Sequence, residues 1–280
     1  MHAIPGDPVD LMLGDYSTEE ERQALRTSLG LNGSLLEQYF SFLTRLLSFN
    51  LGTSIFSGSP VTQLILERLP ATLELSTASI FLACLWGVPA GVLTSSTKSK
   101  QVDFYGTSLG VLGMSIPGYF LGPLLIWLFA IYLGLLPVGG RESFAHLILP
   151  SLSLALPLGS ILMRITRASM QEALMQDYIR VAYSKGISRQ KLYFHHALKN
   201  ALMPIVTVVG LQIGTLLTGT VITETIFNWP GIGTLLFDAI NQRDYPIVQA
   251  CILVIACIYV LVNFITDLIY TLINPKVRIS

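Results

Sequence analysis

The chain has 280 residues, of which 52% are hydrophobic and 12% are charged, and its 17 basic and 17 acidic side chains give a formal net charge of zero. Soluble globular proteins carry about 25% charged residues, so this chain is too poor in charge to cover the surface of a soluble fold. The composition excludes an ordinary soluble protein and indicates a protein that resides in lipid.

Residues 1–70 are the most polar part of the chain, with eight acidic and four basic side chains. No basic and apolar signal peptide opens the sequence, and the stretch Met1–Pro8 (MHAIPGDP) looks like the exit of a helix. We therefore expect residues 1–70 to follow a first span that is absent from this sequence, through a start site placed too late or through truncation.

Five windows without a charged residue follow, and each holds at least 21 residues. They are Leu75–Thr97, Thr107–Gly140, Ser143–Met163, Asn200–Thr223 and Tyr245–Thr266. Since about 20 apolar residues suffice for a helix to cross a bilayer, they predict an all-α polytopic membrane protein with five transmembrane helices. Helices of soluble proteins average about 12 residues, and the alternating segments of about 10 residues typical of a membrane β-barrel are absent.

Basic residues lie mostly on one side of the predicted spans. Two follow the first span, seven lie within residues 164–199 and two lie in the tail, whereas the opposite short loops hold only Arg141 and Arg243. Because cytoplasmic loops are enriched in Lys and Arg, the C-terminus is predicted to be cytoplasmic. The predicted organisation is an extracytoplasmic segment at 1–70, a transmembrane domain at 71–273 with a cytoplasmic segment at 164–200, and a cytoplasmic tail at 274–280.

The cytoplasmic segment has the pattern of two helices joined by a glycine. Apolar residues recur at helical spacing and predict a stripe along an amphipathic helix. The stripe consists of Met170, Leu174, Tyr178, Val181 and Ala182, and the polar face beside it carries Asp177, Arg180 and Lys185. Gly186 is placed to end this helix in a left-handed conformation, and Ser188 can cap a second helix. The stripe must pack on lipid headgroups, on the chain's own spans or on a partner.

Motifs for chemistry on a substrate are absent from the sequence, which has no phosphate-binding loop, zinc-protease motif or nucleophile elbow. His195 and His196 are adjacent and would point about 100° apart on a helix, so they do not form a metal-binding pair. We therefore predict no catalytic residue, no metal site, no cofactor in this chain and no nucleic-acid partner.

Three acids lie within or at the ends of the predicted spans: Glu74, Glu224 and Asp267. A charge inside a span costs a few kcal/mol and marks a functional position. Glu74 and Glu224 lie at outer ends, where hydration is easy. Asp267 lies deeper, and we favour a helix–helix hydrogen bond over a proton relay there because no second membrane acid is close in sequence.

Six motifs occur in a fixed order along the chain. They are Pro5–Pro8 (PGDP), Asp177–Gly186 (DYIRVAYSKG), His196–Pro204 (HALKNALMP), Thr223–Gly233 (TETIFNWPGIG), Arg243–Pro246 (RDYP) and Asn274–Arg278 (NPKVR). Together they resemble the inner-membrane permeases of peptide-type bacterial ABC importers, of the kind that comes first in dipeptide and oligopeptide operons. That family has six spans, so the span without a counterpart here is the first. Arg180 stands where most importers carry an acid, and the acid's role is therefore not assigned to it.

The resemblance implies a type I importer fold and a set of partners. These partners are a second homologous permease, two cytoplasmic ATPases that bind ATP and Mg, an extracytoplasmic solute-binding protein and the lipid bilayer of the inner membrane. The chain itself is then not an enzyme. Contact with an ATPase is implied for Asp177, Tyr178, Arg180, Ala182, Lys185, Gly186 and Ser188.

The translocation path or its gate is expected at Pro117, Gly118, Glu224, Trp229 and Asp267. Pro117 and Pro123 interrupt the second span, and a missing backbone donor bends a helix, which provides either a gate or a fixed packing kink. The outer run 228–233 is expected to be re-entrant or interfacial, and Trp229 can equally serve as an interfacial anchor.

Two other functions compete with this hypothesis. A self-sufficient carrier would show internal repeats and several acids at mid-membrane, and a membrane hydrolase would need a nucleophile or a metal motif; neither feature is evident. Within the importer hypothesis we expect dipeptides or oligopeptides as substrates, with nickel, haem or glutathione as alternatives, because selection lies largely in the binding protein.

Overall fold

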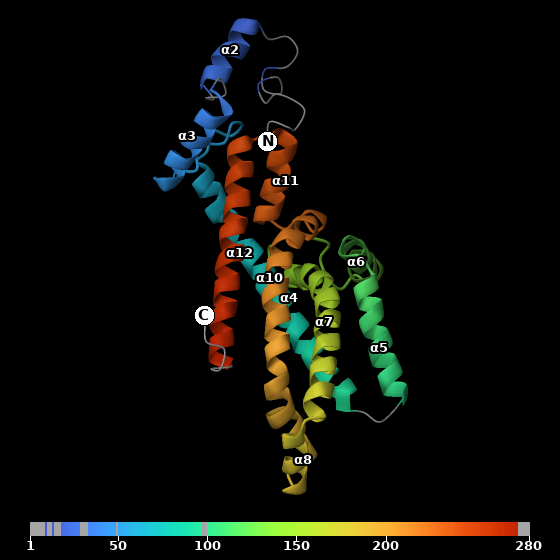
Figure 1. Ribbon diagram of the computed structural model, residues 1–280. Coiled ribbons are helices and arrows are strands. Elements are labelled where there is room, and N and C mark those ends of the chain that lie inside the picture. Colours follow the sequence, from blue (N-terminus) through green and yellow to red (C-terminus); the bar gives the residue numbers. More distant parts are fainter. Residues whose placement is uncertain are drawn as a thin grey trace. The chain divides into compact units, whose positions relative to one another are not determined.

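The computed structural model describes residues 9, 13, 18–28, 33–48, 50–96 and 100–273, and the regular structure in these ranges is helical apart from one isolated bridge between Thr53 and Pro60 (Figure 1). The elements are α2 (Glu19–Ser28), α3 (Leu35–Leu47), α4 (Val61–Ser96), α5 (Lys100–Ser115), α6 (Gly118–Leu125), η1 (Ile126–Tyr132), α7 (Phe144–Leu174), α8 (Asp177–Ser184), α9 (Arg189–Lys191), η2 (Leu192–Ala197), α10 (Leu198–Ile226), α11 (Ile232–Gln242) and α12 (Tyr245–Ile273). The motif at 5–8 and the predicted tail at 274–280 lie outside the described residues.

Four helical stretches in the described ranges are long and apolar enough to cross a bilayer, judged by length and composition. They are Val61–Ser96, Phe144–Leu174, Leu192–Gly214 and Tyr245–Ile269. Each overlaps one of the charge-free windows, as expected because a helix satisfies its own backbone groups where water is absent. The prediction of an all-α membrane protein is confirmed.

The charge-free window 107–140 differs from the other four, because it does not form one helix. α5 ends at Ser115, and Pro117 is extended with φ −60° and ψ 136° before α6 begins at Gly118. Pro123 lies inside α6, and a π-helix, η1, follows directly. A proline has no N–H to donate to the preceding turn, and the interruption predicted at Pro117 and Pro123 is present in the backbone. The single helix expected for this window is replaced by three pieces.

The chain divides into two compact units. Unit 1 comprises residues 1–72 and 230–256, and unit 2 comprises residues 73–229 and 257–280. The long helices α4 and α12 each contribute to both units. The segment 230–256 belongs to the same compact unit as the N-terminal part of the chain. The predicted division into segments 1–70 and 71–273 placed it with the transmembrane domain instead.

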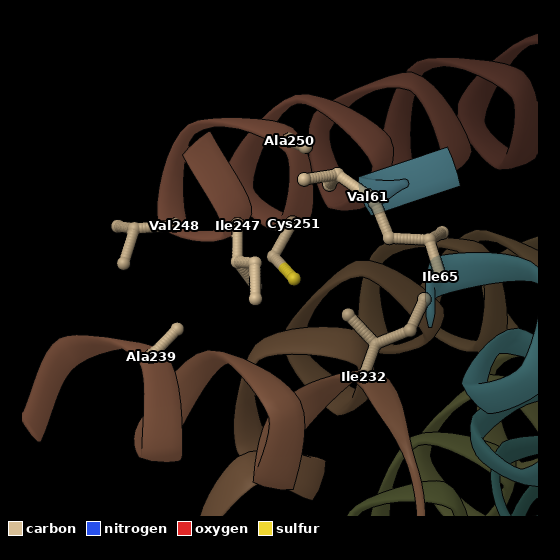
Figure 2. Packing of buried hydrophobic residues seen from close by; sticks show 8 residues of the cluster. All are labelled: Val61, Ile65, Ile232, Ala239, Ile247, Val248, Ala250 and Cys251. Carbon is tan, nitrogen blue, oxygen red and sulfur yellow. The ribbon is translucent and has the colours of Figure 1, made fainter. Parts of the chain in front are cut away.

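The core of unit 1 is a buried apolar cluster supplied by α4, α11 and α12 (Figure 2). It consists of Val61, Ile65, Ile232, Ala239, Ile247, Val248, Ala250 and Cys251. The start of α11 is fixed beside it, because the backbone N–H of Ile232 donates to the Thr72 hydroxyl at 2.8 Å. This bond satisfies one of the donors that a helix leaves unpaired at its first turn.

α2 and α3, for which the sequence interpretation predicted no element, both begin with reciprocal caps. The Thr18 N–H donates to the Glu21 carboxylate at 3.0 Å while the Glu21 N–H donates to the Thr18 hydroxyl at 3.3 Å. Ser34 and Glu37 repeat the arrangement at 2.7 and 3.3 Å. Each pair is a capping box, which satisfies two orphan donors and fixes where the helix starts.

Unit 2 is organised around α7, which packs against α5, α6 and α10 and is the most buried of the four apolar stretches. α4 approaches α7 closely, since a Cβ atom at Gly87 would overlap the carbonyl group of Gly159. The Trp86 indole N–H donates to the Ala155 carbonyl at 3.4 Å at the same crossing. Large apolar side chains such as Phe81 and Phe264 stay exposed, as expected for helices that meet lipid or another membrane subunit.

Candidate functional site

The predicted cytoplasmic segment forms two helical parts joined by a glycine turn, with one break that the sequence did not indicate. α7 continues from the membrane span to Leu174, and the chain then turns at Met175 before α8 begins at Asp177. After α8, the backbone turns at Gly186 and continues into α9 and η2. We call residues 177–197 the elbow.

Gly186 ends α8 as predicted, with φ +76°. The Gly186 N–H donates to the Tyr183 carbonyl at 3.0 Å, and the Ile187 N–H donates to the Ala182 carbonyl at 3.3 Å. These two bonds form a Schellman motif, which needs a residue in the left-handed region and favours glycine there. The Ser188 carbonyl then accepts from the Leu192 N–H at 3.0 Å, so Ser188 lies at the start of the second helical part.

The buried face of the elbow differs from the predicted stripe. Ile179 and Ala182 are buried, together with Met170, whereas Tyr178 is 38% exposed and Val181 is 54% exposed. The predicted stripe assumed one continuous helix, and the break at residues 175–176 changes the rotation of α8 relative to α7. The buried side chains form one cluster that ties the elbow to unit 2: Val92, Met170, Ala173, Ile179, Ala182, Leu192, Ala197 and Ala201.

The outer face of the elbow is exposed and mixes charged with apolar side chains. Asp177 and Arg180 form an ion pair of 3.4 Å on this face, and Lys185 is also exposed. With side chains this exposed, such a pair adds little to stability. Tyr183 and Phe194 are exposed too, at 62% and 55%. The elbow is therefore packed against unit 2 on its inner side and exposed on its outer side.

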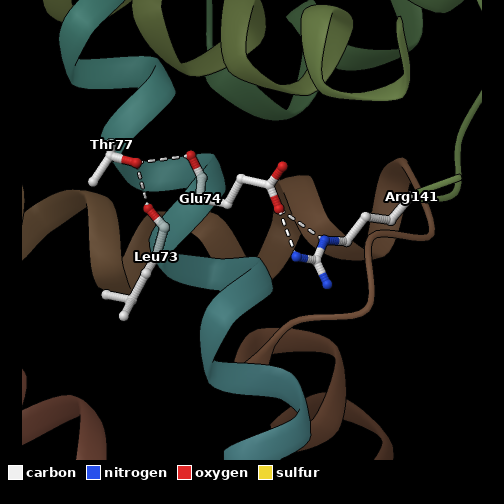
Figure 3. Close-up of polar contacts among 4 residues, drawn as sticks. All are labelled: Leu73, Glu74, Thr77 and Arg141. Atoms are coloured by element: carbon white, nitrogen blue, oxygen red, sulfur yellow. Dashed lines mark hydrogen bonds and ion pairs between the residues drawn. The ribbon is translucent and has the colours of Figure 1, made fainter. Parts of the chain in front are cut away.

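A second cluster, formed by Glu74, Arg141, Phe227 and Trp229, brings together three segments that are distant in sequence. The Arg141 Nε–H donates to Glu74 Oε2 at 2.8 Å, and the terminal Nη2 of Arg141 lies 2.7 Å from the same oxygen (Figure 3). It also lies 5.8 Å from the centre of the Trp229 ring, a cation–π distance. We call these four residues the Arg141 cluster.

The turn that follows α10 is held by the loop before Arg141. The Gly140 N–H donates to the Phe227 carbonyl at 2.9 Å, and a Cβ atom at Gly139 would overlap that carbonyl. Asn228 adopts φ +47°, and the Trp229 N–H donates back to the Glu224 carbonyl at 2.8 Å. Asparagine is among the residues that tolerate this conformation, which explains how the turn reverses the chain so sharply.

The five residues predicted for the path or gate fall into two groups. Pro117, Gly118 and Asp267 are exposed on unit 2. Glu224 and Trp229 are instead buried, with 0% and 1% of their surfaces exposed. The expectation that Glu224 is easily hydrated at a helix end is wrong, because the chain folds back at Trp229 over the last turn of α10.

Arg141 is the functional candidate that the sequence interpretation missed. In the sequence, Arg141 is one of two basic residues in the short loops opposite the basic segment, and no functional role was predicted for it. Its partners Glu74 and Trp229 lie 67 and 88 positions away in the sequence, and no local pattern links residues at such distances. Within the described residues, no group of three or more His, Cys, Asp or Glu side chains is placed to hold a metal ion.

Two family models, both for the same kind of transport component, together match most of the chain. Residues 87–279 match the family described as the binding-protein-dependent transport system inner membrane component, and residues 1–76 match the N-terminal model of the same kind of component. The chain belongs to this family of importer permeases. Permeases of this family are multi-pass inner-membrane subunits, and their description implies a binding-protein partner.

Several relatives of this permease match it over nearly its whole length. The glutathione transport system permease protein GsiC of Pectobacterium atrosepticum is 40% identical over 278 residues, covering 99% of this chain and 91% of the relative. A probable peptide ABC transporter permease of Sinorhizobium fredii is 43% identical with the same coverage. The dipeptide transport system permease protein DppB of Escherichia coli is 38% identical, again over 99% and 91%.

Solved structures show the same fold at low sequence identity. A chain of the inward-facing MetNI methionine ABC transporter has a TM-score of 0.65 and 17% identity, covering 76% of this permease and 97% of that chain. A chain of an amino acid ABC transporter has a TM-score of 0.57 and 17% identity, covering 77% and 95%. The predicted likeness to ABC importer membrane domains is thereby confirmed for the fold.

Proposed function

We propose that this permease forms, with a second homologous permease, a path through which an ABC importer moves dipeptides, oligopeptides or a small peptide such as glutathione across the inner membrane. The observation that carries the proposal is the match over 99% of the chain to permeases named for glutathione, peptide and dipeptide transport. These names share the peptide as a chemical class.

The proposed topology has five crossings with the C-terminus in the cytoplasm and residues 1–70 outside. Four crossings are the long apolar helical stretches, and the remaining one is built from α5, α6 and η1 together. The divided backbone at Pro117 suits a crossing that borders a protein-lined path, because irregular backbone is tolerated at membrane depth only where protein or a water-filled cavity surrounds it. Pro117 and Gly118 then belong to the path or its gate.

The elbow is proposed to receive the movement of a cytoplasmic ATPase, which binds ATP and Mg in its own subunit. Its outer face carries Asp177, Tyr178, Arg180 and Lys185, all exposed, while Ala182 fixes its inner face to unit 2. Gly186 and Ser188 set the angle between its two helical parts. An elbow that is packed against unit 2 transmits a movement of the ATPase better than a flexible loop does, because packed interfaces move as units.

The buried pair Glu224 and Trp229 is proposed to act at the outer end of the path, with Asp267 nearer the cytoplasmic end. Arg141 lies over the Trp229 ring and the Gly140 N–H bonds the Phe227 carbonyl, so any opening of this end must displace the Phe227–Trp229 turn. A substrate reaches Glu224 only when that turn moves.

Uptake of a labelled dipeptide into proteoliposomes tests this function. The complete importer, with both permeases and both ATPases, is reconstituted with its binding protein outside. We expect uptake that requires ATP and the ATPases. Uptake by the permease alone would instead establish an ATP-independent carrier, and ATP-driven uptake of nickel or haem without peptide uptake would reject the substrate class.

A charge-reversal pair tests the elbow within the same assay. Arg180→Glu is expected to lower ATP-driven uptake severalfold, because it reverses a charge on the proposed ATPase contact. Glu142→Lys is a matched control, since it reverses an exposed charge in the loop predicted to lie on the opposite side. Equal effects of the two variants would reject the ATPase contact.

A further inference from the structure

Residues 52–60, which precede α4, form a tight hairpin in unit 1. The Ser54 N–H donates to the Ser59 carbonyl at 2.9 Å, the Gly58 N–H donates to the Ser54 carbonyl at 3.1 Å, and the Val61 N–H donates to the Gly52 carbonyl at 3.0 Å. Phe56 stands within the turn and is 43% exposed. The hairpin is therefore ordered by its own backbone, with an aromatic side chain presented outward.

A buried carboxylate fixes this hairpin to the turn between α11 and α12. The Ser54 hydroxyl donates to Asp244 Oδ2 at 2.5 Å, and the Ile55 N–H donates to the same oxygen at 3.1 Å. The Ser57 N–H in turn donates to the Ser54 hydroxyl oxygen at 3.0 Å. These bonds connect residues 190 positions apart in the chain, and both Ser54 and Asp244 are buried.

Asp244 accepts both bonds through Oδ2, so a single oxygen holds the Ser54 hydroxyl and the Ile55 N–H together. Asp244 is 0% exposed, and its Oδ1 atom has no hydrogen-bond partner among the described residues. Burying a carboxylate with one unpaired oxygen opposes folding, so apolar packing alone does not account for this residue. Its two bonds instead hold the hairpin in one conformation.

The position of the hairpin in the chain limits which partner can reach it. The first 14 residues of α4, 61–74, precede the charge-free window that begins at Leu75, and they correspond to about 21 Å of helix. Glu67, Arg68 and Glu74 lie in this stretch, so it favours water over hydrocarbon. On the proposed topology it lies outside the cell membrane, where a lipid chain or a cytoplasmic ATPase cannot touch the hairpin.

We propose that the 52–60 hairpin is a preformed docking surface for the extracytoplasmic solute-binding protein, with Phe56 as its contact residue and Asp244 as its positioning residue. This inference rests on the proposed function and topology, because the family description supplies the class of partner. The hairpin carries no charged side chain, so the contact is an aromatic anchor rimmed by serine and threonine hydroxyls. Holding such a surface in its bound conformation lowers the entropy lost on association.

Binding measurements on the complete importer in lipid nanodiscs test the proposal. The probe is the importer's own binding protein, purified without ligand and labelled with a fluorophore. Phe56→Ala is expected to weaken its binding roughly tenfold, as for an aromatic hot spot. Asp244→Ala is expected to weaken it similarly, whereas Asp244→Asn retains most of the affinity because the amide oxygen still accepts from Ser54 and Ile55.

Phe81→Ala is the matched control, since Phe81 is an exposed phenylalanine within the charge-free part of α4. Wild-type affinity in Phe56→Ala, in an importer that transports, would overturn the docking surface. Equal losses in Asp244→Asn and Asp244→Ala would overturn the positioning role. If Asp244→Ala does not assemble, the affinity of Phe56→Ala alone tests the docking surface, because Phe56 is exposed. Failure of the wild-type importer to bind the binding protein would reject the proposed function itself.

Discussion

Replacing Gly186 with alanine separates the shape of the elbow from its chemistry. Gly186 adopts φ +76°, and a Cβ atom placed there would meet nothing within 4 Å. The substitution therefore introduces no clash, and its cost is the backbone strain of a left-handed non-glycine residue, about 1–2 kcal/mol. The chain can relieve this strain by rotating the turn, which changes the angle between α8 and η2. We expect ATP-driven uptake to fall severalfold while the complex still assembles.

Gly134 provides a matched control for this prediction. It adopts φ +64°, and a Cβ atom there also has open space around it, so Gly134→Ala carries the same strain in a loop predicted to face the other side. Gly186→Asn should restore much of the uptake, because asparagine tolerates the left-handed conformation better than alanine. Uptake, ATP hydrolysis and thermal unfolding are measured on reconstituted importers.

Equal losses of uptake in Gly186→Ala and Gly134→Ala would refute the role of the elbow's angle, because backbone strain alone would then explain the loss. Uptake by Gly186→Asn that is no higher than uptake by Gly186→Ala would also refute this role.

Three further variants test separate parts of the structure. Gly87→Ala should lower the thermal unfolding temperature in detergent, since its Cβ atom would overlap the Gly159 carbonyl and overpacking costs about 1–3 kcal/mol. Arg141→Ala should cost less than about 1 kcal/mol, because the Glu74 ion pair is half-exposed, but should raise protease cleavage near Trp229. The Thr18 N–H and hydroxyl hold the pKa of Glu21 below its ordinary value. The cap therefore stabilises α2 fully at a pH above the ordinary pKa of a glutamate, and this stabilisation is lost as the pH falls through the lowered pKa of Glu21. Amide hydrogen exchange at residues 19–22 should quicken in acid and, in Thr18→Ala, at neutral pH.

The positions of the elbow's glycine turn and of four apolar spans were predictable because each depends on residues close in sequence. A run without charges favours lipid whatever surrounds it, and a glycine after a basic helical turn ends a helix through its own backbone. The buried face of the elbow was not predictable in the same way, because it depended on a two-residue break at Met175 that no proline or glycine marks.

The sequence by itself determined that this protein is a helical membrane protein, because the scarcity and placement of charges decide between lipid and water residue by residue. Its resemblance to importer permeases came from six ordered motifs, which can be read directly along the chain. Only the tertiary structure decided that Arg141 meets Glu74 and Trp229, that Glu224 is buried, and that Asp244 fixes a hairpin 190 positions away. Such contacts join segments whose spacing along the chain carries no periodic signal, and they form only when the helices that carry them pack together.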